Sequence, residues 1–508
     1  MKNRHWLLIG IVIIALFLRT YHLKELPPGL YPDEAMDGNN ALHALHAGEW
    51  SVFYPENNGR EGLFMNIQAV FIKFLGGEVW VLRLPSTLFG IFTVIGLYFL
   101  TRELLRVSKK FSDSDGAAIA LLSAYFLATS FWHINFSRIS FRAISSPFFM
   151  VWALYLLFLG YRKMRDDSAK RLSAWHLLGG VVFGLGMYTY IAYRTMPAVI
   201  GIIFIYFFLI AKREGWLRKF FCTSASYAAL AFATAIPLLY YFAVHPGSFF
   251  GRTSQVSVAA GGHTFRDLLF NTVKTAGMFD FVGDFNWRQN FAGRPELFWP
   301  VGICFIVGIC LALKKLFARN DAGGNFLKRL FSENNLPYAM LFSFGIFAAL
   351  PVVISNEGIP HALRSILIIP PVFILAGLGS YKIYRWLTSL SRSPWIPRAL
   401  AVILVLLFVE AYTAYFVIWG KNPNVQGAFA ADYAKLGNEL NSLPTATPKY
   451  VVVRAGGVLV NGIPMPAQTV MYITDTWDAK QQQEKNIHYV LPEDEAVIPS
   501  SSLKFYIQ

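Results

Sequence analysis

The stretch "WLLIGIVIIALFL", Trp6 to Leu18, is followed shortly by the polar stretch "YPDEAMDGNN", Tyr31 to Asn40. The apolar run is short enough to be the hydrophobic region of a signal peptide. However, basic residues and a Pro-Pro pair follow it, and the small-x-small pattern of a cleavage site is missing. We therefore predict an uncleaved first membrane helix, with a group of carboxylates close to the membrane.

The composition is that of a membrane protein. Of the 508 residues, 55% are hydrophobic and 15% are charged, against about 25% charged residues in soluble domains. Aromatic residues reach 16%, which fits either interfacial belts or a lipid-lined cavity. The net charge of +15 would suggest a nucleic-acid partner in a soluble protein, but here we assign it to membrane topology and expect no nucleic acid. The three cysteines form no metal-binding pattern, so we expect neither a disulfide framework nor zinc.

Further apolar runs predict an α-helical polytopic membrane protein with about 11–13 transmembrane helices. Together with the first run, there are eleven. The others cover residues 79–100, 117–136, 141–160, 175–190, 195–210, 227–244, 297–313, 338–354, 362–379 and 399–419.

Basic residues in the connectors fix the predicted orientation, because Lys and Arg in short loops mark the cytoplasmic side. With the N-terminus inside, every second loop carries four or five basic residues. Three longer segments then face outward: residues 20–78, 245–296 and 421–508. We expect a transmembrane domain over 1–420 and a small extracytoplasmic α/β region over 421–508, where "DYAKLGNELNSL" has helical spacing and "KYVVV" and "TVMYIT" are β-rich. Residues 62–77 predict a helix lying in the membrane interface.

The short outer loops hold few basic residues, so the presence of each one calls for a structural or functional explanation. Arg138 and Arg142 are four apart and would share one face of a helix. They either snorkel to headgroups or clamp a phosphate, which a guanidinium binds bidentately. His361 and Arg364 present the same choice, although a helix-capping role is open, and Arg194 is typical of a membrane anchor.

The outer acids have two readings. Asp33, Glu34 and Glu61 could belong to a solvated acidic loop, and Asp37 reads as a local helix or loop partner. Alternatively, an outer cavity with arginines and a few placed acids is what phosphate displacement requires: cations hold the leaving group while a carboxylate takes a proton from the nucleophile. Asp284 and Arg288, in "GDFNWRQN", either fix a long loop or line the acceptor side.

The order of several motifs resembles a known family. "PDEAMDGNNALHALHAG", "GREGLFMNIQAVFIKFLGG", "NFSRISFRAISSPFF", "GLGMYTYIAYRTMP" and "GIPHALRSI" resemble the bacterial protein O-mannosyltransferases and aminoarabinose transferases, which belong to the GT-C glycosyltransferases. The resemblance covers residues 6–379. It implies that Asp33 and Glu34 serve the reaction centre. Relatives carry an acid followed closely by proline where this chain has Glu61 and Gly62, so the resemblance supports Glu61 less.

The resulting hypothesis is a membrane glycosyltransferase that moves a hexosyl or pentosyl group from a polyprenyl phosphate to an extracytoplasmic acceptor, with inversion. Asp33 is the predicted general base, and Glu34 or Glu61 orients the acceptor or binds a divalent metal. The donor phosphate would contact some of the four outer residues Arg138, Arg142, His361 and Arg364. No nucleotide-binding fingerprint is present.

Two other classes remain open at this stage. A lipid or sugar-lipid flippase would also have many helices around a basic cavity, but neither paired halves nor midplane acids are evident in the sequence. A non-catalytic sugar-lipid binding protein would share the same helices and loops. The sequence does not identify the sugar or the acceptor.

Overall fold

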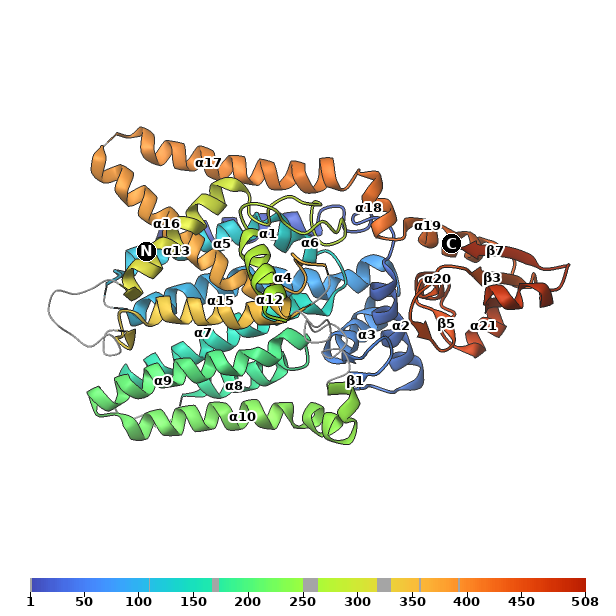
Figure 1. The fold of residues 1–508 in the computed structure, drawn as a ribbon, viewed down its shortest axis with the longest axis horizontal. Helices are drawn as coiled ribbons and strands as arrows, with labels where there is room; N and C mark the ends of the chain where they lie inside the picture. The colour runs from blue at the N-terminus through green and yellow to red at the C-terminus, as the bar shows by residue number, and fades with distance from the viewer. Residues whose placement is uncertain are drawn as a thin grey trace.

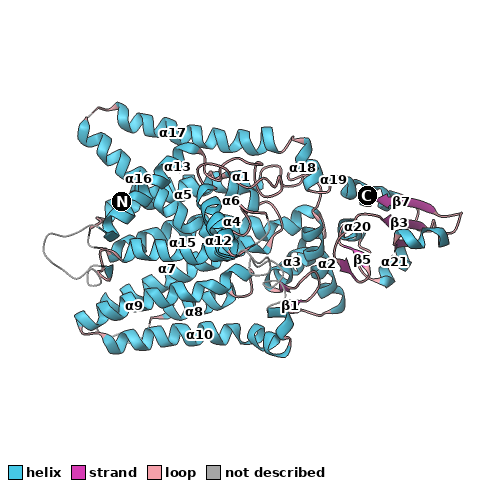
Figure 2. Cartoon of the chain, viewed as in Figure 1, coloured by secondary structure: helices cyan, strands magenta, loops and turns pink. Residues whose placement is uncertain are grey.

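The computed structural model describes residues 2–108, 110–166, 173–249, 264–317, 330–355, 358–391 and 393–508. A bundle of long helices runs along the longest dimension of the molecule, and a small α/β region lies beyond one end of the bundle (Figures 1 and 2). The chain begins at the opposite end from this region. Parts of the predicted basic loops, residues 109, 167–172, 318–329 and 392, lie outside the described residues.

Within the described residues, eight helical segments are long and apolar enough to cross a membrane, so the predicted multi-pass helical architecture is confirmed. They are α4 (Val79–Val107), η1–α7 (Arg142–Asp166), η2–α9 (Ile191–Glu214), α10 (Leu217–Val244), α13 (Trp299–Phe317), α15 (Leu336–Val353), η4–α16 (Ile366–Leu390) and α17–η5 (Trp395–Trp419). Three more of the predicted runs form helix α1 (Lys2–Thr20) and the shorter helices α5 (Asp113–Ala128) and α8 (Ala174–Gly186).

One predicted span is broken. Residues 117–136 form α5 and then a separate short helix, α6 (Phe131–Phe136). The break lies at Ser130, whose side chain accepts a hydrogen bond from the backbone N–H of His133 and so caps the start of α6. The capping serine thus lets the chain turn where hydropathy alone indicates one continuous helix.

The helices differ in how deeply they are buried. The apolar windows of α7 and α16 are 83% buried inside the protein, whereas those of α10 and α17 are 28% buried and face outward. Helices α13 and α16 approach closely through small residues: a Cβ on Gly379 would lie 1.8 Å from the carbonyl oxygen of Cys304. Such close contact through glycine is typical of helix pairs in membranes.

Residues 20–78, the predicted first external segment, form a compact unit at the end of the bundle. It contains α2 (Pro32–Ala47), the hairpin β1 (Phe53–Tyr54) and β2 (Arg60–Glu61), and α3 (Leu63–Leu75). Proline at the first helical position of α2 suits the fixed φ of that residue. The antiparallel register pairs Tyr54 with Arg60. Helix α12 (Thr264–Gly277) belongs to the second external segment.

The C-terminal region has the predicted α/β character. Its elements are α18 (Pro423–Ala428), α19 (Ala431–Ser442), β3 (Lys449–Val453), β4 (Leu459–Val460), β5 (Ile463–Pro464), α20 (Ala467–Thr474), α21 (Ala479–Lys485), β6 (Ile487–Val490), η6 (Pro492–Val497) and β7 (Leu503–Ile507). A parallel sheet has the strand order β6-β3-β7, and β4 and β5 form a separate hairpin.

The expectation of a strand at "TVMYIT" is wrong, because these residues lie in helix α20. Nearly the whole of α20 is buried between α19 and α2. Asn39 of α2 donates to both the backbone and the side-chain oxygen of Gln468, at 3.2 and 2.9 Å. Tyr472 donates to the carbonyl oxygen of Gly77 at 2.8 Å. Tertiary packing outweighs the β propensity of this segment, and it fixes the C-terminal region against the first external segment.

Candidate functional site

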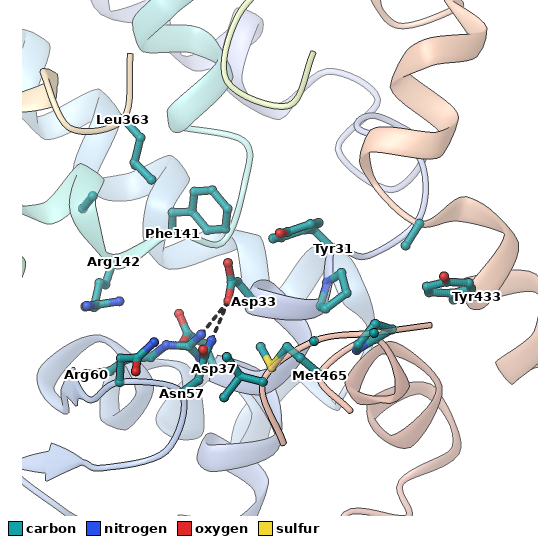
Figure 3. A pocket seen from close by; sticks show the side chains of 18 of the residues that line it. Tyr31, Asp33, Asp37, Asn57, Arg60, Phe141, Arg142, Leu363, Tyr433 and Met465 are labelled. Atoms are coloured by element: carbon teal, nitrogen blue, oxygen red, sulfur yellow. Dashed lines mark hydrogen bonds and ion pairs between the residues drawn. The ribbon is translucent and has the colours of Figure 1, made fainter. Parts of the chain in front are cut away.

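A cavity of about 490 Å³ lies where the bundle, the first external segment and the C-terminal region meet (Figure 3). The first external segment contributes residues 31–33, 37, 57, 58 and 60. The bundle contributes residues 141–143, 190 and 363, and the C-terminal region contributes residues between 427 and 466. Segments far apart in the sequence therefore share one cavity.

Asp33 lies at the centre of this cavity. Its Oδ1 accepts hydrogen bonds from Nη2 of Arg60 at 2.7 Å and from Nδ2 of Asn57 at 3.0 Å. Its other oxygen points away from Arg60 in Figure 3 and has no hydrogen-bond donor among the described residues. With 38% of the side chain exposed, Asp33 can accept a proton from a molecule in the cavity.

Asp37 shares the guanidinium of Arg60 with Asp33, and Nη1 of Arg60 lies 2.8 Å from Oδ1 of Asp37. Burial raises the pKa of Asp37, and Arg60 partly offsets this increase. For Arg60, burial lowers the pKa, but the two carboxylates outweigh it and raise the pKa above its ordinary value. The prediction that Asp37 is a local partner fits the Arg60 contact, but Asp37 also lines the cavity.

Arg142 is the predicted outer cation that lines the cavity. Its Nε donates to Oε2 of Glu61 at 3.3 Å, and Nη2 of Arg194 lies 3.1 Å from Oε1 of the same carboxylate. Glu61 is almost fully buried and does not line the cavity. The buried carboxylate therefore positions Arg142, and Arg194, expected to be a simple anchor, takes part in this arrangement.

Arg288 and Tyr31 form a second cationic contact at the cavity. The guanidinium carbon of Arg288 lies 3.6 Å from the ring centroid of Tyr31, which lines the cavity. The Nε of Arg288 is buried and has no hydrogen-bond partner among the described residues. Arg288 itself does not line the cavity, so it contributes positive charge from behind the Tyr31 ring.

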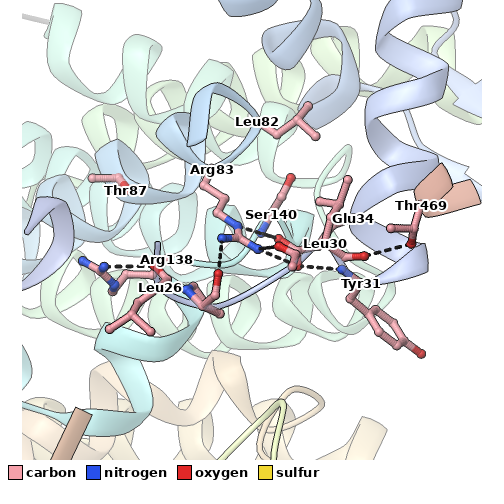
Figure 4. A network of polar contacts seen from close by, with 12 residues as sticks. Leu26, Leu30, Tyr31, Glu34, Leu82, Arg83, Thr87, Arg138, Ser140 and Thr469 are labelled. Atoms are coloured by element: carbon pink, nitrogen blue, oxygen red, sulfur yellow. Dashed lines mark hydrogen bonds and ion pairs between the residues drawn. The ribbon is translucent and has the colours of Figure 1, made fainter. Parts of the chain in front are cut away.

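Glu34 does not reach the cavity, although it follows Asp33 directly. Its side chain is fully buried. Oε2 of Glu34 accepts hydrogen bonds from Nε of Arg83 at 3.2 Å and from the backbone N–H of Ser140 at 2.7 Å (Figure 4). Arg83 also donates to the carbonyl oxygens of Pro27 and Gly29. The structure thus makes Glu34 a brace between the first external segment and the bundle.

The expectation that Arg138 and Arg142 share one helix face is wrong. Arg138 follows the end of α6, whereas Arg142 begins η1. The guanidinium of Arg138 is buried and donates to the carbonyl oxygens of Leu18, Tyr21 and Leu26. The structure therefore places Arg138 outside the cavity, where it holds the end of α1 (Figure 4).

The remaining predicted residues lie beside the cavity. Oδ2 of Asp284 accepts the backbone N–H of Ala362 at 2.8 Å and lies 3.9 Å from Nδ1 of His361. Burial raises the pKa of Asp284 to about 6. His361 and Arg364 flank Leu363, which lines the cavity, but they are not lining residues themselves. Asp284 thus connects the 283–290 segment to the 361–364 loop.

The described carboxylates do not match what a divalent metal needs. Carboxylate-bound metals are held by several oxygen ligands. Within the described residues, no group of three or more His, Cys, Asp and Glu side chains could hold a metal ion. Between Asp33 and Asp37, the space is taken by the guanidinium of Arg60. This pair of carboxylates does not fit a metal, and we derive no step through one.

Sequence reasoning missed Arg60, Tyr31 and the C-terminal wall of the cavity. Arg60 precedes Glu61 in the quoted motif "GREGLF", and Asp33 and Asp37 are spaced to share one helix face. These two signals were available in the sequence. No signal in the sequence indicated that residues 427–466 would approach Asp33.

Comparisons with known proteins support the predicted family and fold. Residues 63–241 match the family described as dolichyl-phosphate-mannose-protein mannosyltransferase. No curated protein gives a significant match. The whole chain is similar in structure to ArnT from Cupriavidus metallidurans bound to undecaprenyl phosphate, with a TM-score of 0.56 and 15% identity, covering 98% of this chain and 89% of ArnT.

The second group of similar structures comes from Archaeoglobus fulgidus. Its oligosaccharyltransferase tethered with an acceptor peptide has a TM-score of 0.52 and 13% identity, and the match covers 97% of this chain and 64% of that one. The oligosaccharyltransferase AglB in complex with an inhibitory peptide and a dolichol-phosphate has a TM-score of 0.52 and 13% identity, covering 97% and 70%. This chain thus spans about two thirds of the archaeal proteins. The predicted GT-C fold is confirmed.

Proposed function

We propose that this chain, which has the GT-C glycosyltransferase fold and the mannosyltransferase family match over residues 63–241, transfers a sugar from a polyprenyl phosphate to an extracytoplasmic acceptor. The observation that carries the proposal is that Asp33 and Arg142 line the same cavity. A carboxylate that can take a proton therefore faces a cation that can hold a phosphate, and displacement at a sugar phosphate needs both.

Asp33 and Arg142 supply the base and the phosphate-binding cation that this transfer needs. The acceptor hydroxyl or amine loses its proton to the free oxygen of Asp33 and forms a bond to the anomeric carbon. The bond from that carbon to the phosphate oxygen breaks, and the polyprenyl phosphate leaves with the electron pair. Because nucleophile and leaving group lie on opposite sides of the carbon, the configuration inverts. Arg60 keeps the Asp33 carboxylate in position through its 2.7 Å hydrogen bond.

The donor phosphate is assigned to the cationic side of the cavity. Arg142 lines it and is oriented by Glu61, and a guanidinium binds phosphate oxygens in a bidentate manner. Arg288 adds a positive charge behind the ring of Tyr31. His361 and Arg364 flank the same side of the cavity through Leu363.

The hydrocarbon tail of the donor needs an apolar environment within the bundle. A second cavity of about 330 Å³ lies among α5, α13, α16 and α17, with mostly apolar lining residues such as Leu400, Ile403 and Leu407. Its apolar lining supports binding of a lipid chain. The outward-facing helix α17 leaves this region close to the surrounding lipid.

The orientation is proposed from the charge pattern of the loops. The N-terminus and the α9–α10 and α16–α17 turns lie at the end of the bundle opposite the C-terminal region (Figure 1). These are loops in which basic residues gather, so that end is assigned to the cytoplasm. The cavity and the C-terminal region are then extracytoplasmic.

The test compares cells that lack the gene with cells carrying wild-type, Asp33→Asn or Glu49→Gln protein. Glu49 is an exposed acid of the same external segment and serves as the control. Mass spectrometry of surface glycans, glycolipids and glycoproteins would find the product in wild-type and control cells only. Purified Asp33→Asn protein should bind undecaprenyl phosphate as the wild type does.

Two results would contradict the proposal. Product formation by Asp33→Asn at the wild-type level would show that Asp33 is not the base. If cells with and without the gene carry identical surface glycans while the purified protein moves polyprenyl phosphate between leaflets of vesicles, the chain would be a flippase.

A further inference from the structure

The cavity around Asp33 has two chemically different sides. Its cations, Arg60 and Arg142, come from the first external segment and the bundle. The lining residues that come from the C-terminal region are glycine, alanine, valine, methionine, proline and tyrosine, so none of them is charged. In Figure 3, Arg142 lies to one side of Asp33, and Met465 and Tyr433 lie to the other.

The uncharged side is held firmly in place. It is formed by the base of the β4–β5 hairpin and by the start of α19, and both adjoin α20. Besides the Gln468 and Tyr472 contacts, the hydroxyl of Thr469 donates to the carbonyl oxygen of Leu30 at 2.8 Å. Leu30 directly precedes the cavity residue Tyr31. The position of this wall relative to Asp33 is therefore set by buried hydrogen bonds.

A second hollow continues from the cavity along the C-terminal region. It is lined by residues 426, 427 and 430–433 together with Lys435. Gly427, Ala430 and Tyr433 line both hollows. A molecule longer than one sugar can therefore extend from Asp33 past Tyr433 to the outside.

We infer that the C-terminal residues that line this cavity, at positions 427, 430, 433, 456–458, 465 and 466, form its acceptor-binding wall, and that the acceptor is uncharged where it contacts them. The inference rests on the proposed function. It identifies residues that select the acceptor, separate from those that carry out the chemistry.

The charges of the lining residues determine which substrate binds on which side of the cavity. The donor phosphate is an anion, and the proposed function assigns it to Arg142, whereas the lining residues of the wall offer no counter-charge. A charged acceptor group pressed against the wall would lose hydration without a partner, which is unfavourable. An uncharged acceptor, however, loses little hydration free energy at this neutral wall. It gains apolar contacts with Val458, Met465 and the Tyr433 ring.

The test places single charges of both signs on the wall. Val458 is suitable because its side chain is 47% exposed, so Val458→Glu and Val458→Lys leave the fold intact. Gly456 offers a second position, because a Cβ there would meet nothing within 4 Å. Leu459 is the matched control: it is 58% exposed and does not line the cavity.

The measured quantity is the product species that distinguishes wild-type cells from cells lacking the gene. We expect Glu and Lys at 456 or 458 each to lower its amount roughly tenfold, a loss of about 1.4 kcal/mol of binding. Binding of undecaprenyl phosphate to the purified variants should equal that of the wild type. Leu459→Glu and Leu459→Lys should form wild-type amounts of product.

The outcomes separate the inference from the proposed function. If wild-type cells form no product, the proposed function fails. If they do and the charged variants match them, the wall does not contact the acceptor and the inference is overturned. If Glu lowers product while Lys preserves or raises it, or the reverse, the acceptor is charged at the wall, which also overturns the inference.

Discussion

Arg60 donates to Oδ1 of Asp33 at 2.7 Å, so a buried guanidinium holds the proposed base at the cavity. The same guanidinium reaches Asp37 with a second nitrogen at 2.8 Å. One cation therefore pairs with two carboxylates. The chemistry at Asp33 therefore depends on a residue from the short hairpin that follows α2.

Arg60→Lys should lower transfer by about 10- to 100-fold, because a single ammonium cannot bridge two carboxylates as a planar guanidinium does. The loss should fall on kcat. Burial already raises the pKa of Asp37, and the Arg60 charge opposes this, so weaker pairing should raise the pKa of Asp37 further and change the pH–rate profile. Arg454→Lys, at an exposed pair in the C-terminal region, is the control. An unshifted pH profile would mean that Arg60 only supports the fold.

Glu34→Gln should destabilise the protein by about 3–5 kcal/mol, because it leaves Arg83 buried without its counter-charge. Both side chains are fully buried. Thermal unfolding in detergent measures the loss, and the double variant Glu34→Leu/Arg83→Leu should lose less than the two single variants added together. If Glu34→Gln keeps wild-type stability but loses transfer, Glu34 acts in the reaction, as the family resemblance implies.

Arg142→Gln should weaken binding of undecaprenyl phosphate by about 10- to 100-fold, since a charge-assisted hydrogen bond contributes about 1.5–3 kcal/mol. Arg142→Lys should fall between the variant and the wild type. Arg194→Gln should have a smaller effect because Arg194 contacts Glu61 but does not line the cavity. Equal losses for Arg142→Gln and Arg194→Gln, measured by native mass spectrometry or titration calorimetry, would remove Arg142 as a direct phosphate contact.

Chelators should leave transfer unchanged. Arg60 occupies the space between Asp33 and Asp37 that a cation would need, and the described residues offer no cluster of ligands. Activity assayed after dialysis against EDTA, with and without added Mg²⁺ or Mn²⁺, tests this. A loss that returns with the added ion would contradict it.

The stability of the wild type should depend on Asp284 between about pH 4 and 6. Burial raises the pKa of this carboxyl from 3.8 to about 6, so the folded state binds its proton more tightly than the unfolded state. The contribution is therefore fully present below the unfolded pKa and is lost as pH rises through the folded pKa. Unfolding temperatures of wild type and Asp284→Asn at pH 4.5 and 7 measure the difference. An equal change with pH in both proteins would show that other groups, such as Glu296, control it.

Hydropathy and the distribution of basic residues were enough to predict the helical membrane architecture. Apolar runs of this length have no other stable arrangement in a bilayer than helices. The order of motifs indicated the family and directed attention to Asp33 and Arg142. The break at Ser130 and the helix at "TVMYIT" were missed, because a capping hydrogen bond and burial against α2 outweigh local hydropathy and β propensity.

The three acids of "YPDEAMDGNN" show what was not predicted from the sequence. Successive residues on a helix point about 100° apart, whereas residues four apart share a face. Asp33 and Asp37 accordingly meet Arg60 at the cavity, while Glu34 turns away and meets Arg83. The motif indicated the adjacent residues Asp33 and Glu34, but helix geometry brings together Asp33 and Asp37, which are four residues apart.

The sequence by itself indicated that the chain crosses the membrane many times and that Asp33 lies in a stretch that resembles a family motif. Only the tertiary structure decided which groups act together. Glu61 and Arg142 are distant in sequence, and so are Asp33 and the 427–466 wall. The Arg142–Glu61 hydrogen bond joins the first pair, and packing of α2 against α20 places the second pair at one cavity; no local sequence pattern connects these residues.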